Sequence, residues 1–147
     1  RDRYDLAAGV PVPYRNTFLV AAEGGNETLE NAEPGALISH ASLNVSVYFA
    51  SNVLALRSSK ISNLKNKVAS RRLGHTGPED MRKVHTNVYA IDCDNFNNTY
   101  NMPTGHSYFL EDNKGRPGKV FEHLYSTIKT GRVTVSDERN RRHVLPE

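Results

Sequence analysis

The stretch Ser46-Val47-Tyr48-Phe49-Ala50-Ser51-Asn52 decides the fold that we expect for this chain. Its apolar run is typical of a buried strand, and small polar residues end it. Apolar residues then recur with helical spacing from Val53 to Val68, and Asn52 is a suitable helix N-cap. We therefore expect a strand that passes directly into one long helix, which ends at the Gly-rich stretch Gly74–Pro78.

The flanking segments predict mainly strands and loops. Residues 1–44 are rich in Gly, Pro, Asn and Glu, and two apolar runs in them, Thr17–Ala22 and Ala36–Ile38, predict one or two short strands. Further strands are expected at Val84–Ile91, Tyr108–Leu110 and Arg132–Ser136, with an edge at Val144-Leu145, whereas Lys119–Ile128 fits a strand or a helix. Strands outnumber helices and do not alternate with them. This pattern favours an α+β fold with an antiparallel or mixed sheet and argues against a doubly wound nucleotide fold.

Length and composition are those of one globular domain, so we expect a single domain over residues 1–147. A chain of 147 residues is long enough for one core, and 37% hydrophobic with 24% charged residues is typical of a folded protein. No apolar run approaches the roughly 20 residues of a membrane span, and the first residues lack the apolar stretch of a signal peptide. We expect a soluble chain.

The basic residues gather at Lys60–Arg72 and Arg139–His143, and the net charge is +3. A charge of this size is common in small soluble domains, so a solvated surface is the simpler interpretation and a nucleic-acid partner stays an alternative. The single Cys93 excludes an internal disulfide framework. The polar run Asp92–Asn98 resembles half of a calcium loop but lacks the spacing and the final Glu of an EF-hand, so no metal is expected.

Several short motifs occur in a suggestive order. Arg3-Tyr4-Asp5 comes first, Val47–Asn52 and its helix follow, and Asn87–Asp92 then leads into Asp94-Asn95-Phe96. This order resembles the pertussis-toxin and cholera-toxin group of ADP-ribosyltransferases over residues 3–136. The resemblance implies split antiparallel or mixed sheets with one main helix after the Ser46–Asn52 strand. It also implies NAD as substrate, a host protein as target, and a secreted protein that acts inside a host cell.

The resemblance also assigns roles to residues. Arg3, with Tyr4 beside it, falls on the arginine that anchors the NAD phosphates, and Ser51 falls on the family's Ser-Thr-Ser position. Glu122 falls on the catalytic glutamate. The family has Gln or Glu where this chain has Val120, which would share a strand face with Glu122. The resemblance therefore implies at most weak NAD cleavage, or a pseudoenzyme that is kept for binding another protein.

These roles have a physical basis. One carboxylate beside the ribose stabilises the oxocarbenium-like state of nicotinamide release, and an arginine fork binds pyrophosphate oxygens in a bidentate manner. Histidines are further candidate acids and bases: His40, His75, His85, His106, His123 and His143.

Two other functions stay open. The first is a non-enzymatic secreted effector or interaction module that binds a host protein or nucleic acid through its basic helix and tail. The second is a small ribonuclease-like protein, because Arg132–Val135 and His143-Val144 resemble the closing strands of guanyl-specific ribonucleases.

Overall fold

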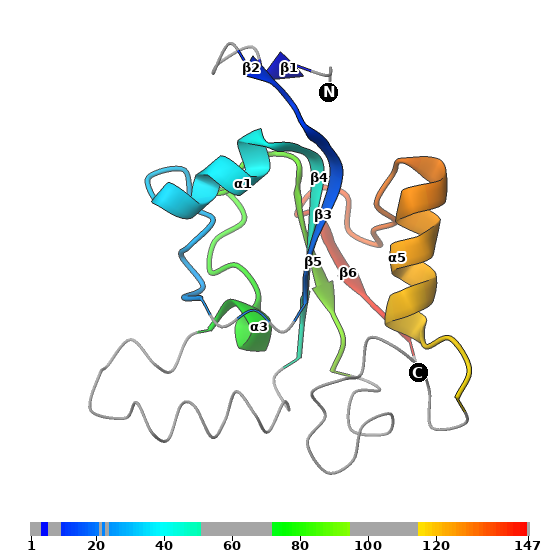
Figure 1. Cartoon of the computed structure of the whole chain (residues 1–147). Helices are drawn as coiled ribbons and strands as arrows, with labels where there is room; N and C mark the ends of the chain where they lie inside the picture. The colour runs from blue at the N-terminus through cyan, green and yellow to red at the C-terminus, as the bar shows by residue number, and fades with distance from the viewer. Residues whose placement is uncertain are drawn as a thin grey trace.

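The computed structural model describes residues 4–5, 10–20, 22, 24–50, 72–94 and 115–146. Its central feature is a four-stranded parallel sheet in the order β3-β4-β5-β6 (Figure 1). The strands are β3 (Tyr14–Val20), β4 (Ser42–Phe49), β5 (Val88–Asp92) and β6 (Arg142–Val144). A separate antiparallel ribbon precedes the sheet and consists of β1 (Tyr4–Asp5) and β2 (Val10–Pro11).

The expected α+β class with antiparallel or mixed split sheets, like the ADP-ribosyltransferase-like architecture that implied it, is wrong. All pairs of neighbouring strands in the main sheet are parallel. Parallel neighbours need a crossover connection, which usually contains a helix. The helices between the strands are η1 (Pro34–Ala36), α1 (Leu37–His40), α3 (Leu73–Thr76) and α5 (Lys119–Thr130). Ala36–Ile38, one of the two apolar runs expected to supply one or two short strands, lies in η1 and α1. The alternation of strands and helices that marks a parallel sheet was therefore not visible in the sequence.

β4 is buried on both of its faces, which explains the continuous apolar run that predicted it. Successive side chains of a strand alternate between the two faces. Val45, Val47 and Phe49 belong to one core cluster, and Tyr48 and Ala50 belong to the other. A strand that is covered on both sides is typical of the interior of a parallel sheet.

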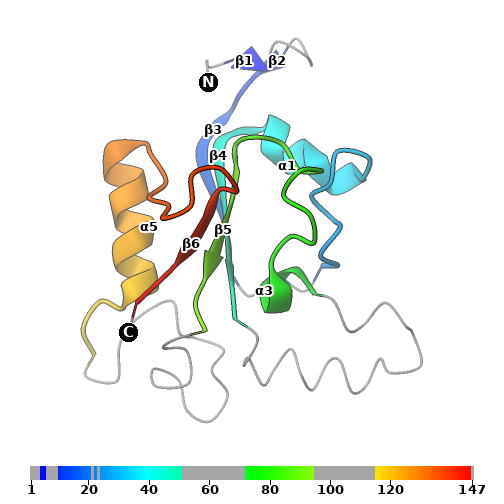
Figure 2. The ribbon, with the colours of Figure 1, turned by 180° about the vertical axis from the view of Figure 1, so that it is seen from behind.

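The two faces of the sheet carry different helices. Leu73 of α3 and Ile38 of α1 pack in the cluster on the first face, whereas Val120 and Leu124 of α5 pack in the cluster on the second (Figures 1 and 2). The strand order runs in one direction, so connections on opposite faces have opposite hand. Figures 1 and 2 show that the β3–α1–β4 connection is right-handed and the β5–α5–β6 connection is left-handed, which is rare for parallel strands.

Lys119–Ile128, which fits a strand or a helix in the sequence, lies in the helix α5. It starts after Pro117 and Gly118, and it ends at Gly131, whose φ of 72° is the left-handed C-cap conformation that favours glycine. α5 is the longest helix of the described residues. None of the helices in the described part of the chain is long and apolar enough to cross a membrane.

Three other local predictions have different outcomes. Arg132–Ser136 is not a strand: Val133 and Val135 pack in the core as part of a connection that returns to β6 through paired backbone bonds of Asp137 and Arg142. The helix expected after Asn52 lies almost entirely outside the described residues. Where Gly74–Pro78 was expected to end it, α3 forms a short helical turn that stops at Gly77.

Candidate functional site

The carboxyl ends of β4 and β5 form the most distinctive edge of the sheet. After β4 the next described helix, α3, lies on the first face, whereas after β5 the next described helix, α5, lies on the second (Figure 1). In open α/β sheets, ligands bind at the carboxyl ends of strands whose connections lie on opposite faces, usually where the strand order reverses. Here the order does not reverse, and the change of face comes with the left-handed β5–α5–β6 connection. We call this place, defined by Ala50 and Asp92–Asp94, the β4/β5 switch point.

Two carboxylates lie at the switch point. Asp92 ends β5 opposite Phe49, and the backbone N–H of Asp94 donates to Oδ1 of Asp92 at 2.9 Å. Burial raises the pKa of the Asp92 carboxyl above its ordinary value; the charge of Asp94 adds to the rise, whereas the Asp94 N–H and Arg142 oppose it. A half-buried carboxylate at a strand end is a strong acceptor for hydroxyl groups of a ligand.

Cys93, between the two carboxylates, is a core residue. Its side chain is fully buried, its Sγ lies 3.6 Å from the Ile91 carbonyl, and its backbone N–H donates to the Phe49 carbonyl at 2.9 Å. Burial raises the pKa of the thiol well above its ordinary value, and the negative charges of Asp92 and Asp94 raise it further. A neutral, enclosed thiol is a poor nucleophile, so Cys93 fixes the strand end rather than reacting.

A glycine pair and an arginine share this edge of the sheet. Gly24 and Gly25 follow β3, and the backbone of Arg72 bridges Gly25 at the start of α3. Leu73 N–H donates to the Gly24 carbonyl at 2.8 Å, and Ala50 N–H donates to the Gly74 carbonyl at 3.1 Å. These bonds hold the half-buried Arg72 next to the ends of β3 and β4, on the same edge as Asp92. Arginine and a small-residue turn are the groups that suit a phosphate.

Of the residues that the resemblance singled out, the structure describes only Tyr4 and Glu122. Arg3 and Ser51 lie outside the described residues, although Ala50, directly before Ser51, belongs to the switch point. Tyr4 is in β1, at the amino end of the sheet, whereas Glu122 is in the first turn of α5, at the carboxyl end (Figure 1).

The orientation expected for Glu122 is also wrong. Val120 and Glu122 would share a face on a strand, but in a helix they point to nearly opposite sides. Val120 is fully buried, whereas the Glu122 side chain is exposed and lies 3.5 Å from Lys119 Nζ. Glu122 therefore faces solvent, paired with its helical neighbour.

A buried network joins α5 to the sheet under the second face. The Tyr48 hydroxyl lies 2.7 Å from His123 Nδ1, and His123 Nε2 lies 2.9 Å from the Thr134 carbonyl. A carbonyl only accepts, so Nε2 carries the proton and Tyr48 O–H donates to Nδ1. The His143 ring stacks on His123 at 5.3 Å between centroids. Burial lowers the pKa of both histidines, and His143 lowers that of His123 further. The network is enclosed, so it holds α5 in place.

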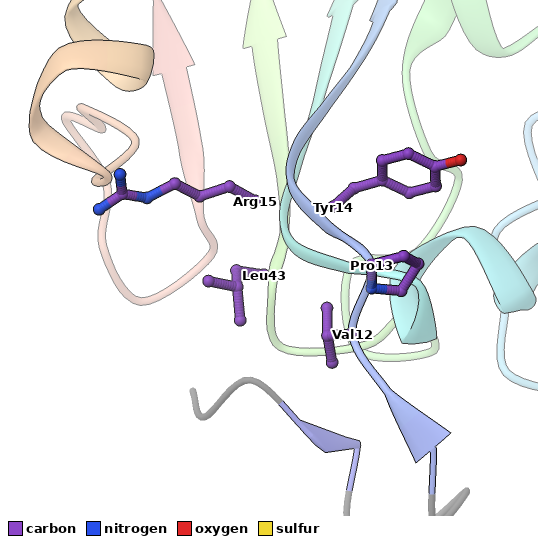
Figure 3. A pocket seen from close by; sticks show the side chains of 5 residues that line it. All are labelled: Val12, Pro13, Tyr14, Arg15 and Leu43. Atoms are coloured by element: carbon purple, nitrogen blue, oxygen red, sulfur yellow. The ribbon is translucent and has the colours of Figure 1, made fainter.

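A hollow of about 490 Å³ lies at the opposite, amino edge of the sheet. Its lining is mainly apolar: Val12, Pro13, Tyr14, Arg15 and Leu43 (Figure 3). Arg15 is its one charged side chain, and its guanidinium lies beside Gly131 at the carboxyl end of α5, where a positive charge suits the helix dipole. The described residues that line the hollow supply no convergent polar groups, so we take the switch point as the better site.

Among the described residues, no group of three or more His, Cys, Asp or Glu side chains could hold a metal ion. The sequence analysis treated Asp92 and Asp94 as part of a turn. The signal that could have identified them is an acid placed directly after a β-branched strand, but it gains meaning only once that strand is known to be parallel to its neighbours.

Comparisons with known proteins identify no relative of this chain. The chain matches no protein-family model, no curated protein and no solved structure.

Proposed function

We propose that this chain binds a nucleotide at the β4/β5 switch point. The observation that carries the proposal is the placement of α3, the next described helix after β4, and α5, the next described helix after β5, on opposite faces of the sheet, with the carboxylate of Asp92 at the end of β5. Acidic residues at strand ends accept hydrogen bonds from ribose hydroxyls in parallel α/β sheets. Arg72 and the Gly24-Gly25 turn, on the same edge, supply groups that suit a phosphate.

NAD is the first ligand to test, because it contains both ribose and pyrophosphate and because the motif order already pointed to it. The proposal is one of binding. Glu122, the carboxylate that the resemblance assigns to cleavage, faces solvent on α5. The expectation of a secreted effector that acts on a host protein stays a prediction.

The test is a calorimetric titration of the whole chain with NAD, ADP-ribose, ADP and pyrophosphate. Ribose-containing ligands should bind, and Asp92→Asn should weaken them roughly 10- to 100-fold, because a hydrogen bond to a charged group is lost. Pyrophosphate, which lacks ribose, should be insensitive to Asp92→Asn and sensitive to Arg72→Gln. Glu138→Gln removes an exposed carboxylate outside the switch point and should bind like the wild type.

A thermal melt separates lost binding from lost folding. Because the folded state raises the pKa of Asp92, its charge is disfavoured there at neutral pH, and Asp92→Asn should melt at a higher temperature than the wild type. Equal binding of NAD by the wild type and a folded Asp92→Asn, or no binding of any of the four ligands, would refute the proposal. Release of nicotinamide by the wild type and not by Glu122→Gln would instead restore Glu122 as a catalytic residue.

A further inference from the structure

One flank of α5 carries an exposed apolar stripe. Phe121, Tyr125 and Ile128 are spaced at i, i+4 and i+7, and they are 44%, 58% and 51% exposed. The Phe121 and Tyr125 rings stack at 6.5 Å with an interplanar angle of 7°. We call these three residues the α5 stripe. One exposed apolar residue is ordinary, but three on one helical face form a contiguous surface that favours a partner.

The stripe lies on the flank of α5, beside its buried side. The buried side of α5 consists of Val120, His123 and Thr127, with Leu124 at its border. At 100° per residue the centre of the stripe lies about 120° around the helix from the centre of the buried side, so Ile128 is next to Leu124 and Tyr125 is farthest from the core. Figures 1 and 2 show α5 as the outermost layer of the second face, with its solvent side open among the described elements.

The charges beside the stripe indicate which partner fits. Glu122 and Lys129 are both exposed, lie seven residues apart, and therefore flank the stripe on the same side, two turns from each other. When two identical helices pack antiparallel about a two-fold axis, equivalent flanks meet. With Tyr125 near the axis, Glu122 of one copy lies opposite Lys129 of the other, and the pair occurs twice. A parallel arrangement would not bring these flanks together.

We propose that the α5 stripe is the contact of an antiparallel homodimer, with Glu122 and Lys129 pairing between the two copies. Glu122 would exchange or share its Lys119 partner for Lys129 of the second copy. A 12-residue helix is about 18 Å long, so a contact made by α5 alone is smaller than a standard interface. The dimer should therefore be weak and dependent on concentration.

Sedimentation velocity of the whole chain from about 1 µM to about 1 mM, a range over which weak interfaces dissociate, tests the proposal. The wild type should shift from monomer to dimer within it. Tyr125→Lys should stay monomeric throughout. Because Tyr125 is exposed, that variant should keep the circular dichroism spectrum of the wild type.

Charge reversal identifies the arrangement of the helices. Glu122→Lys and Lys129→Glu each place like charges opposite one another at two points, and each should weaken dimerisation about tenfold. The double variant restores opposite charges and should recover the wild-type association. Glu138→Lys, an exposed reversal outside α5, is the matched control for net charge and should have no effect.

Three results would overturn the proposal. The first is a wild type that stays monomeric over the whole range, which would leave the stripe to another partner. The second is a folded Tyr125→Lys that dimerises like the wild type. The third is a double reversal that associates no better than the single variants, since this excludes the antiparallel Glu122–Lys129 pairing. If Tyr125→Lys does not fold, the charge reversals decide the outcome alone.

Discussion

Removing the hydroxyl of Tyr48 tests whether the buried network holds α5 to the sheet. Tyr48→Phe keeps the ring in the core but leaves His123 Nδ1 without its donor at 2.7 Å. The imidazole cannot compensate by changing tautomer, because its Nε2–H already donates to the Thr134 carbonyl. A buried acceptor that loses its partner costs about 1–3 kcal/mol. We expect a loss of about 2 kcal/mol in the free energy of unfolding.

Urea titration and thermal melting measure this loss. For a chain of this length, about 2 kcal/mol corresponds to a fall of about 4–8 °C in Tm. Tyr89→Phe is the matched control. Tyr89 packs against the same core cluster from the neighbouring strand, but its hydroxyl makes no hydrogen bond within the described residues. We expect its free energy of unfolding to change by less than about 0.5 kcal/mol.

A double-mutant cycle then attributes the loss to the pair. His123→Leu removes the orphaned nitrogen, so Tyr48→Phe should cost much less in that background than in the wild type, with a coupling of about 1 kcal/mol or more. Two results would refute the reasoning: a Tyr48→Phe that is as stable as Tyr89→Phe, or additive effects of Tyr48→Phe and His123→Leu.

Two further predictions concern pH and backbone conformation. The folded state lowers the pKa of His123 and His143, so the unfolded chain binds protons first as the pH falls. The free energy of unfolding should therefore decrease as the pH drops below about 6.5, which urea midpoints at intervals from pH 8 to pH 5 measure. His143→Gln should reduce the dependence of the urea midpoint on pH. A flat profile over that range would contradict the buried, neutral histidines. Gly77 and Gly131 both have positive φ, but a Cβ on Gly77 would also lie 2.8 Å from the Phe49 ring, so Gly77→Ala should lower Tm more than Gly131→Ala, which should cost about 1 kcal/mol.

The strands were predictable where their residues are buried on both sides. The apolar run at Ser46–Phe49 and the β-branched and aromatic segment ending at Ile91 identified β4 and β5 because full burial leaves a continuous apolar pattern. Whether these strands run parallel depends on which segments pair across the chain. That pairing depends on crossover connections whose helices can be as short as the four residues of α1. Such a helix has too few turns for a helical period to show in the sequence.

α5 was ambiguous for a different reason. Its apolar residues recur with a helical period, at i, i+1, i+4, i+5 and i+8 from Val120 to Ile128. Most of them are β-branched or aromatic, however, and such residues also favour a strand. Conversely, Arg132–Ser136 has a clean strand alternation, because Val133 and Val135 point into the core, yet it gains no ladder partner among the described strands. Alternation indicates which side chains are buried, whereas ladder hydrogen bonds depend on whether a neighbouring strand is available to pair.

The candidate site shows the same limit. Glu122 was singled out because it falls on the catalytic glutamate of the family that the chain resembles, but in α5 its side chain faces solvent. Asp92 was visible in the sequence as a polar residue after a strand, but its value as a ligand group depends on the parallel sheet and on the side from which each connection leaves.

The position of α5 links both proposals. α5 lies on the second face and α3 on the first, so the next described helices after β4 and β5 lie on opposite faces. The same placement leaves the α5 stripe exposed to a second copy. The Tyr48–His123 bond holds that placement, whereas Asp92 belongs to the sheet itself. Weakening the bond should therefore affect the two functions unequally. At temperatures where Tyr48→Phe is still folded, the variant should weaken dimerisation, because the helix that carries the stripe is held less firmly, and it should leave NAD affinity nearly unchanged. Equal losses of dimer affinity and NAD affinity would mean that α5 itself forms part of the nucleotide site.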